Sequence, residues 1–120
     1  NLLTFSEGVK YLEMVDKILK KISKQVLSKN GTLFITSSAG KIENMLDPHT
    51  GEIKKTFTSN PVPFLAISNK LEGKKIGLEE APGNDLSLIK PRYGLEAVAP
   101  SILKTLGLKI PPEFECESII

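Results

Sequence analysis

A short apolar run from Thr32 to Thr36 directly follows an Asn30-Gly31 helix stop, and it constrains the fold more than any other stretch of the chain. The run is too short and too unbroken for an amphipathic helix, so it predicts a buried strand. A small polar turn, Ser37 to Gly40, and a short helical run, Lys41 to Leu46, come next. In open α/β sheets, reactive residues tend to lie where strands end. The side chains of this turn are nevertheless of low chemical reactivity.

A long amphipathic helix is predicted before this strand, because apolar residues recur there at steps of three and four. Ser6 is the predicted N-cap, and Gly31 is the predicted C′ residue in the left-handed conformation. The lysines of this segment fall mostly off the apolar face, which favours a solvated face over a basic patch for a partner. The apolar positions are Phe5, Val9, Leu12, Val15, Leu19, Ile22 and Val26.

The next signals predict a turn and a second strand. Asp47 to Gly51 has Pro early and Gly late, as turns do, and residues 52–59 are expected to be irregular or weakly extended. Phe64 to Ile67 predicts a second buried strand, with Pro61 and Pro63 before it, where no ladder donor is missed.

The last third predicts a hairpin and a helix. The hairpin arms are Lys74 to Ala81 and Leu86 to Lys90, joined by a turn from Pro82 to Asp85. The helix spans Leu95 to Leu106. Within that span we expect the regular helix to begin near Ala99, with Pro100 in its first turn and Gly107 after its end.

This order of elements is typical of an α/β fold with a mixed sheet covered by helices. The length of 120 residues suits a single domain over residues 1–120. Asn1 is a poor residue to follow a removed initiator Met, so we expect this domain to be a segment of a longer protein.

Composition excludes several classes of function. A net charge of +2 argues against nucleic acid as a partner. Cys116 is the only cysteine, so an internal disulfide or a Cys-rich metal site is excluded, and a reducing, cytoplasmic location is favoured. The apolar runs are far shorter than a membrane span, so we expect no membrane partner.

Few residues could carry chemistry. His49 is the only histidine, and its Pro/Gly turn predicts an exposed side chain rather than a ligand. Asp47 and Glu52 beside it could form a weak surface metal site at most. A Ser-His-Asp triad is disfavoured, because no Gly-x-Ser-x-Gly motif raises a serine nucleophile. Arg92 is the only arginine, and a solvated loop position is favoured over an anion contact.

The run Ser38-Ala39-Gly40-Lys41 has a weak likeness to a phosphate loop. A helix starting at Gly40-Lys41 could hold a small anion on its N–H groups. The leading glycine of such loops is missing, however, and Ile42 stands where Ser or Thr would bind magnesium. A tight strand-to-helix turn is therefore the favoured interpretation.

Several segments together resemble the C-terminal part of the bisphosphoglycerate-independent phosphoglycerate mutases, in the alkaline-phosphatase-like superfamily. The resemblance implies that superfamily's α/β fold. It also implies the family reaction, a glycolytic isomerisation of 3-phosphoglycerate to 2-phosphoglycerate through a phosphoserine with two manganese ions. The resembling segments are Lys10 to Asp16, Gly31 to Thr36, Asn44 to Glu52, Thr58 to Phe64, Leu95 to Leu108 and Glu117 to Ile120.

The departures from the family pattern fall on its metal ligands. The resemblance places the family's Asp at Ser38, one His at Ala39 and another at Phe57. Alanine and phenylalanine offer no lone pair, and a neutral hydroxyl is a poor substitute for a carboxylate. Lys54 and Lys55 nearby would repel a cation. We therefore assign no catalytic, cofactor-binding or metal residue, and we expect no cofactor for this chain.

The leading hypothesis is a C-terminal segment of a mutase-like protein without catalytic activity on its own. Its candidate partners are the remainder of a larger mutase-like protein or another protein chain. One alternative is a protein-interaction module derived from a pseudoenzyme, because missing elements would leave a sheet edge uncovered. The other is a small-anion binder at the Gly40-Lys41 helix start.

Overall fold

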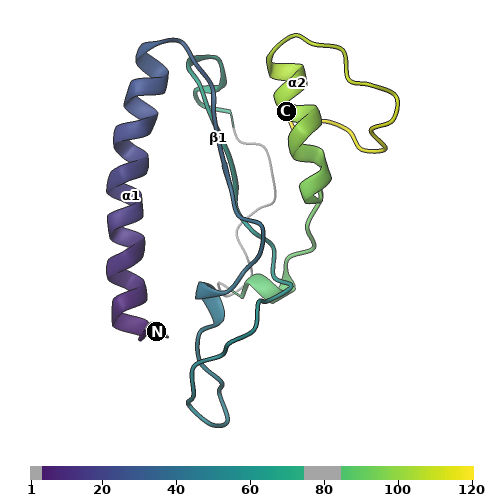
Figure 1. Ribbon diagram of the computed structural model, residues 1–120. Helices are drawn as coiled ribbons and strands as arrows, with labels where there is room; N and C mark the ends of the chain where they lie inside the picture. The colour runs from purple at the N-terminus through teal and green to yellow at the C-terminus, as the bar shows by residue number, and fades with distance from the viewer. Residues whose placement is uncertain (1–3, 75–84) are drawn as a thin grey trace. The chain divides into compact units, whose positions relative to one another are not determined.

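The computed structural model describes residues 4–74 and 85–120 of the chain, which are coloured in Figure 1. Contacts divide the chain into two compact units, Asn1–Glu72 and Gly73–Ile120. The first unit holds one long helix and a two-stranded antiparallel sheet, and the second holds a shorter helix. The described part is thus mixed α/β, and the assignment of residues 1–120 to one domain stays a prediction.

Helix α1 spans Phe5–Ser28, and its first turn is closed by a capping box at Thr4 rather than by the predicted Ser6. The Thr4 backbone N–H and hydroxyl donate to a Glu7 carboxylate oxygen at 2.8 and 2.7 Å, while the Glu7 N–H donates back to the Thr4 hydroxyl at 3.3 Å. The prediction of Ser6 is wrong because the reciprocal pair needs a Glu three residues after the cap.

The other end of α1 closes in a Schellman motif. Asn30, with φ of 53°, takes the left-handed conformation that was predicted for Gly31. The Gly31 N–H donates to the Val26 carbonyl at 2.9 Å, and the Asn30 N–H donates to the Leu27 carbonyl at 3.0 Å. Asparagine tolerates this conformation. Gly31 is needed for space instead, because a Cβ there would lie 2.9 Å from the Val26 Cγ1 atom.

Strands β1, Leu33–Thr36, and β2, Phe64–Ile67, pair antiparallel in the register Leu33↔Ile67 to Thr36↔Phe64. Both predicted strands are therefore present, and the Phe34 and Phe64 rings lie 5.8 Å apart. The strands are half-buried rather than buried, because each has only one strand neighbour in the described residues. The described sheet is antiparallel, whereas a mixed sheet was predicted.

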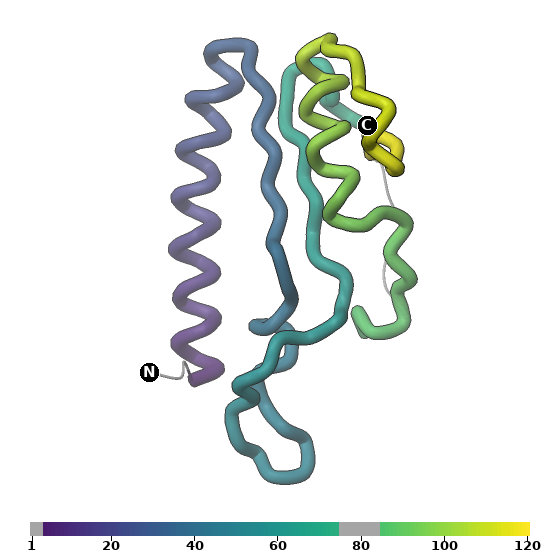
Figure 2. The backbone as a smooth tube through the Cα atoms, turned by 45° about the vertical axis from the view of Figure 1, so that its right-hand side comes forward, coloured from purple at the N-terminus to yellow at the C-terminus, as the bar shows by residue number. Residues whose placement is uncertain are grey.

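Helix α1 runs alongside this ribbon in both views of the backbone (Figures 1 and 2). Gly8 is buried, and a Cβ there would lie 3.1 Å from the Met45 Sδ atom and 3.6 Å from the Ile42 Cδ1 atom. Its lack of a side chain lets α1 approach the single 3₁₀ turn η1, Ile42–Asn44. The short helical run predicted for Lys41 to Leu46 is thus one turn.

The predicted turn at Asp47 to Gly51 is confirmed. The Asp47 Oδ1 atom accepts from the backbone N–H groups of His49 at 2.8 Å and Thr50 at 3.1 Å. Gly51 has φ of 69°, and a bridge between Leu46 and Ile53 closes the loop. Residues 52–59 otherwise carry only isolated bridges, as expected. A second 3₁₀ turn, η2 at Asn69–Leu71, follows β2.

In the second unit the predicted strand at Leu86 to Lys90 is wrong, because Leu86–Leu88 forms the 3₁₀ turn η4. The Asp85 carboxylate accepts from the Ser87 N–H at 2.9 Å and from its hydroxyl at 2.7 Å. Such a local bond competes with strand pairing. Most of the predicted first arm and of the hairpin turn lies outside the described residues.

The final helix is composite. A 3₁₀ turn η5, Leu95–Ala97, leads into α2, Val98–Thr105, one residue earlier than predicted and with Pro100 in the first turn as expected. Gly107, with φ of 69°, follows its end, and the Leu108 N–H donates to the Leu103 carbonyl at 2.9 Å.

The centre of this unit is small and partly polar. Ala97, Pro100 and Ser101 are buried. The Ser101 hydroxyl donates to the Ala97 carbonyl at 2.7 Å and accepts from the Ile119 N–H at 2.9 Å, which ties the C-terminal tail to α2.

No helix in residues 4–74 or 85–120 is long and apolar enough to cross a membrane. Helix α1 has the length, but charged residues of both signs interrupt it on successive turns.

Candidate functional site

The loop after β1 and the loop before β2 meet at one backbone bridge. The Thr58 N–H donates to the Gly40 carbonyl at 2.8 Å, and the pairing is antiparallel. This pairing brings Lys41 opposite Phe57, and the Lys41 ammonium lies 5.3 Å from the Phe57 ring centroid. The structure thus joins the loops that carry Ser38, Ala39 and Phe57, the three positions that the resemblance assigns to metal ligands. Ser38 is exposed, Ala39 is half-buried and Phe57 is 71% exposed.

A carboxylate ties these two loops together. The Thr58 hydroxyl and the Asn60 amide, the latter at 3.3 Å, donate to the Glu43 Oε1 atom. Burial raises the pKa of Glu43. The Thr58 hydroxyl, the backbone N–H groups of Glu43 and Lys41, and the Asn60 amide outweigh this effect and lower the pKa below its ordinary value. We call Glu43, Thr58 and Asn60 the carboxylate tie.

Gly40 is buried directly beneath the carboxylate tie. A Cβ at this position would overlap the Glu43 carboxylate and the Thr58 hydroxyl. Only glycine therefore allows the backbone of the loop to approach the tie this closely.

This geometry counts against the anion-binding alternative at Gly40-Lys41. The helix start is a single 3₁₀ turn of three residues. The backbone N–H groups of Lys41 and Glu43 already lower the pKa of the Glu43 carboxyl group. A phosphate would have to displace the protein's own anion, which is held by two further side-chain donors.

The donor set does not fit the two manganese ions of the resembling family. Ala39 and Phe57 have no donor atom, and the Lys41 ammonium over the Phe57 ring adds a positive charge beside them. Within the part of the chain that the structure describes, no cluster of three or more His, Cys, Asp and Glu side chains could hold a metal ion.

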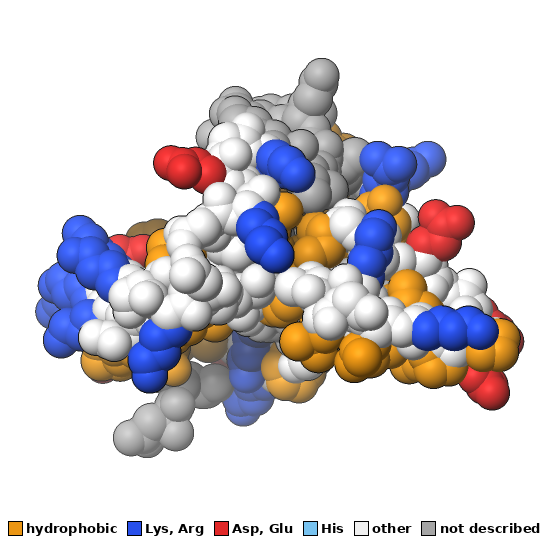
Figure 3. All heavy atoms as spheres, turned by 90° about the horizontal axis from the view of Figure 1, so that it is seen from above, with side chains coloured by type: hydrophobic (Ala, Val, Ile, Leu, Met, Phe, Trp, Pro, Cys, Tyr) orange, Lys and Arg blue, Asp and Glu red, His pale blue; other side chains and the backbone are white. Residues whose placement is uncertain are grey.

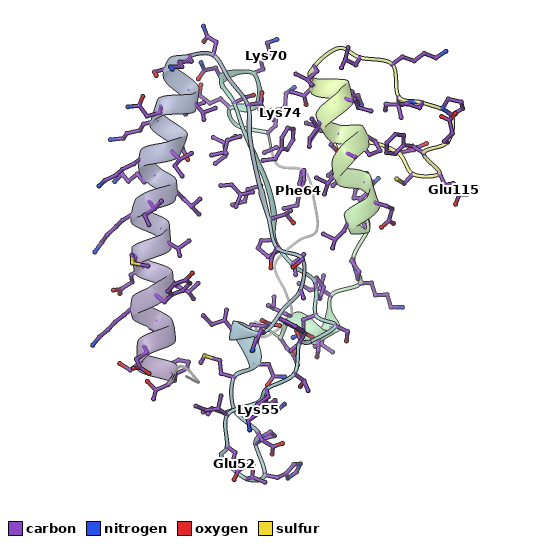
Figure 4. The ribbon with its side chains drawn as sticks, viewed as in Figure 1. Glu52, Lys55, Phe64, Lys70, Lys74 and Glu115 are labelled. Carbon is purple, nitrogen blue, oxygen red and sulfur yellow. The ribbon has the colours of Figure 1, made fainter. Side chains whose placement is uncertain are left out.

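The lysines of this region lie in different surroundings. The Lys54 ammonium donates to the Asn44 Oδ1 atom at 3.1 Å. Figure 4 shows Lys55 on the hairpin loop that also carries Glu52, away from the strands. Lys41 is the lysine that lies beside Phe57, and no local sequence pattern predicts this contact.

The other candidate residues lie at the surface. His49 is exposed as predicted, and its backbone N–H, with that of Thr50, lowers the pKa of Asp47. Arg92 is exposed, with its guanidinium carbon 5.4 Å from the Tyr93 ring centroid.

Comparison of the sequence with known proteins finds one matching family model and several relatives that share one enzyme name. Residues 4–110 match the model of the metalloenzyme superfamily. A 2,3-bisphosphoglycerate-independent phosphoglycerate mutase of Clostridium perfringens is 41% identical over 106 residues, which cover 88% of this chain and 18% of the relative. The enzymes of the same name from Clostridium beijerinckii and Clostridium kluyveri are 37% and 36% identical, over 94% and 97% of this chain and 19% and 20% of their own. The chain spans about a fifth of the length of these relatives.

Proposed function

Because the chain belongs to the metalloenzyme superfamily, we propose that it is a segment of a phosphoglycerate mutase-like protein whose metal chemistry has been lost. It is an alkaline-phosphatase-like segment related to the bisphosphoglycerate-independent mutases. In this proposal it contributes scaffold to a larger α/β domain, in which helices cover a larger sheet, and it has no isomerase activity on its own.

One observation supports the proposal: the two loops that the resemblance aligns with the family site are joined to each other, although the aligned positions offer no carboxylate or imidazole. The bridge at Gly40 and the carboxylate tie join the two loops. The positions that would coordinate ions hold Ser38, Ala39 and Phe57 instead. A cytoplasmic location goes with this proposal, since a lone cysteine suits a reducing compartment.

The direct test measures activity and metal binding together. The purified chain is assayed for conversion of 3-phosphoglycerate to 2-phosphoglycerate with manganese, beside the Clostridium perfringens enzyme as positive control. We expect no turnover above background and no saturable manganese uptake in calorimetry. Turnover that a chelator abolishes would refute the proposal.

A reversion variant tests whether the three positions account for the loss. In Ser38→Asp/Ala39→His/Phe57→His the bridge at Gly40 would bring carboxylate and imidazole donors onto adjacent loops. We expect measurable manganese binding by this variant and none by the matched surface variant Ser59→Asp/Thr56→His. Equal behaviour of the two variants would argue that these positions do not form the former site.

A protein-interaction module is the second candidate function. Its support is the β1–β2 ribbon, in which each strand has one edge without a strand neighbour in the described residues. Open edges invite pairing with another chain. Light scattering combined with a pull-down tests it, and a clean monomer that captures nothing would argue against it.

A further inference from the structure

Helix α1 carries a second apolar line beside the one that faces its own unit. Tyr11, Met14, Ile18 and Ile22 are 50, 48, 46 and 42% exposed. Their steps of three, four and four place them along one side of the helix. We call these four residues the α1 flank.

The α1 flank is distinct from the inner face of the helix. On that face Gly8 is buried, and Val15 and Leu19 are half-buried. Of the flank residues, only Ile22 belonged to the apolar pattern expected from the sequence. Four large apolar side chains in one line, each about half exposed, form a surface of the kind that partners cover.

Charge limits what can cover the α1 flank. At 3.6 residues per turn, Lys10, Lys17 and Lys21 fall along its border on the side away from the inner face, and all three are exposed. Lys and Arg side chains crowd the left of Figure 3, where α1 lies in Figure 1. If a second copy of the chain packed antiparallel on the flank, the lysine borders of the two copies would face and repel each other. A partner with an apolar surface and an acidic border is therefore more complementary.

The ribbon beside α1 has apolar side chains on both of its faces. Paired residues of an antiparallel ladder share a face, so Ile35 and Leu65 lie on one face, and Phe34 and Ala66 on the other. Both faces are therefore apolar, as in the interior of an α/β domain. The relatives carry about four fifths of their length outside the region that matches this chain.

We propose that the α1 flank is the docking surface for the part of a mutase-like domain that lies outside this chain. In this inference, which rests on the proposed function, the segment that covers the α1 flank is a polypeptide that presents an apolar patch bordered by Asp or Glu.

Cysteine labelling tests this proposal in the full chain and in a chimera. The chimera carries this chain in place of the matching segment of the Clostridium perfringens enzyme. In a Cys116→Ser background with the native cysteines of the relative replaced, Met14→Cys reports on the flank. Lys20→Cys reports on the solvated side of α1 away from the flank, where Lys20 is exposed. Ile18→Cys is a second flank reporter if the first variant misfolds.

We expect both sites to react with a maleimide at similar rates in the isolated chain. In the folded chimera, labelling at the flank site should slow by at least about tenfold, because reaction then requires local opening. The rate at Lys20→Cys should not change.

The outcomes separate the two proposals. A folded chimera whose flank site reacts as fast as in the isolated chain overturns the docking surface and leaves the proposed function standing. A chimera that does not fold overturns the proposed function. Slow maleimide labelling at the flank site already in the isolated chain also overturns the docking surface, because the flank is then covered without the rest of a larger domain. Protection that rises with protein concentration would identify a second copy as the cover.

Discussion

The substitution Gly40→Ala should weaken the joint between the loops after β1 and before β2. Its φ is not in the left-handed region, so the backbone can accept alanine. The new Cβ would instead overlap the Glu43 carboxylate and the Thr58 hydroxyl. Relief of this overlap requires the carboxylate to leave its two side-chain donors.

The expected size follows from those bonds. A hydrogen bond to a charged group is worth about 1.5–3 kcal/mol, and because Glu43 is exposed we take the low end for the whole tie, about 2 kcal/mol. Alanine also restricts the unfolded chain, which returns about 0.4–1 kcal/mol. The net loss in free energy of unfolding should be about 1–2 kcal/mol.

Urea unfolding followed by far-ultraviolet circular dichroism measures this loss, and hydrogen exchange at the Thr58 N–H reports on the bridge itself. Gly8→Ala is the matched control. Its Cβ would be close only to the end of the flexible Met45 side chain, at 3.1 Å, and would make an ordinary contact with the Ile42 Cδ1 atom at 3.6 Å. Alanine also favours the helix by about 0.5–1 kcal/mol.

A double-mutant cycle identifies the cause of the loss. In a Glu43→Ala background, the cost of Gly40→Ala should shrink by at least half. A cost that is equal in both backgrounds, or no larger than that of Gly8→Ala, would refute the reasoning.

Three further predictions concern the two units separately. The pKa of Glu43 is lowered in the folded state, so Glu43 stabilises the fold above its unfolded pKa of about 4.3 and this stabilisation is lost as pH falls through the folded pKa. Between pH 6 and pH 3, the free energy of unfolding should therefore fall more steeply for the natural chain than for Glu43→Gln. Parallel curves for the two proteins would contradict this. Thr4→Ala should destabilise the chain by about 1 kcal/mol, whereas Ser6→Ala should be near neutral, and a larger effect at Ser6 would reverse the cap assignment. Ser101→Ala should cost about 1–3 kcal/mol and expose the Ile119 N–H to hydrogen exchange, and unchanged exchange there would show that the tail is held by other contacts.

Regular elements could be predicted because their signals are local and repeated. The apolar periodicity located α1, and the two short apolar runs located β1 and β2. The errors at the ends of α1 concern which of several adjacent residues caps it. Thr4 and Glu7 do carry the T-x-x-E spacing of a capping box, so this error could have been avoided.

Other features could not be predicted, because they depend on residues that are far apart in the sequence or on a single local hydrogen bond. The bond between Thr58 and Glu43 joins residues 15 positions apart in irregular segments, where neither helix nor strand periodicity applies. At Leu86 to Lys90 the apolar pattern predicted a strand, but the side chain of Asp85 closes a 3₁₀ turn first. The α1 flank was not predicted, because the apolar periodicity was assigned to one side of the helix, whereas the helix carries apolar residues both on its inner face and along the flank.

The carboxylate tie explains how a metal site could be lost without losing the loops that carried it. Had the ions themselves held the two loops together, removal of their ligands would leave unpaired polar groups and a weakened joint. Here the joint is made by a backbone bridge, a glycine with no side chain, and a carboxylate with two side-chain donors. None of these groups is at Ser38, Ala39 or Phe57. Under the proposed function, replacement of ligands at those positions would therefore remove chemistry but little stability. The Lys41 ammonium over the Phe57 ring adds a favourable contact there.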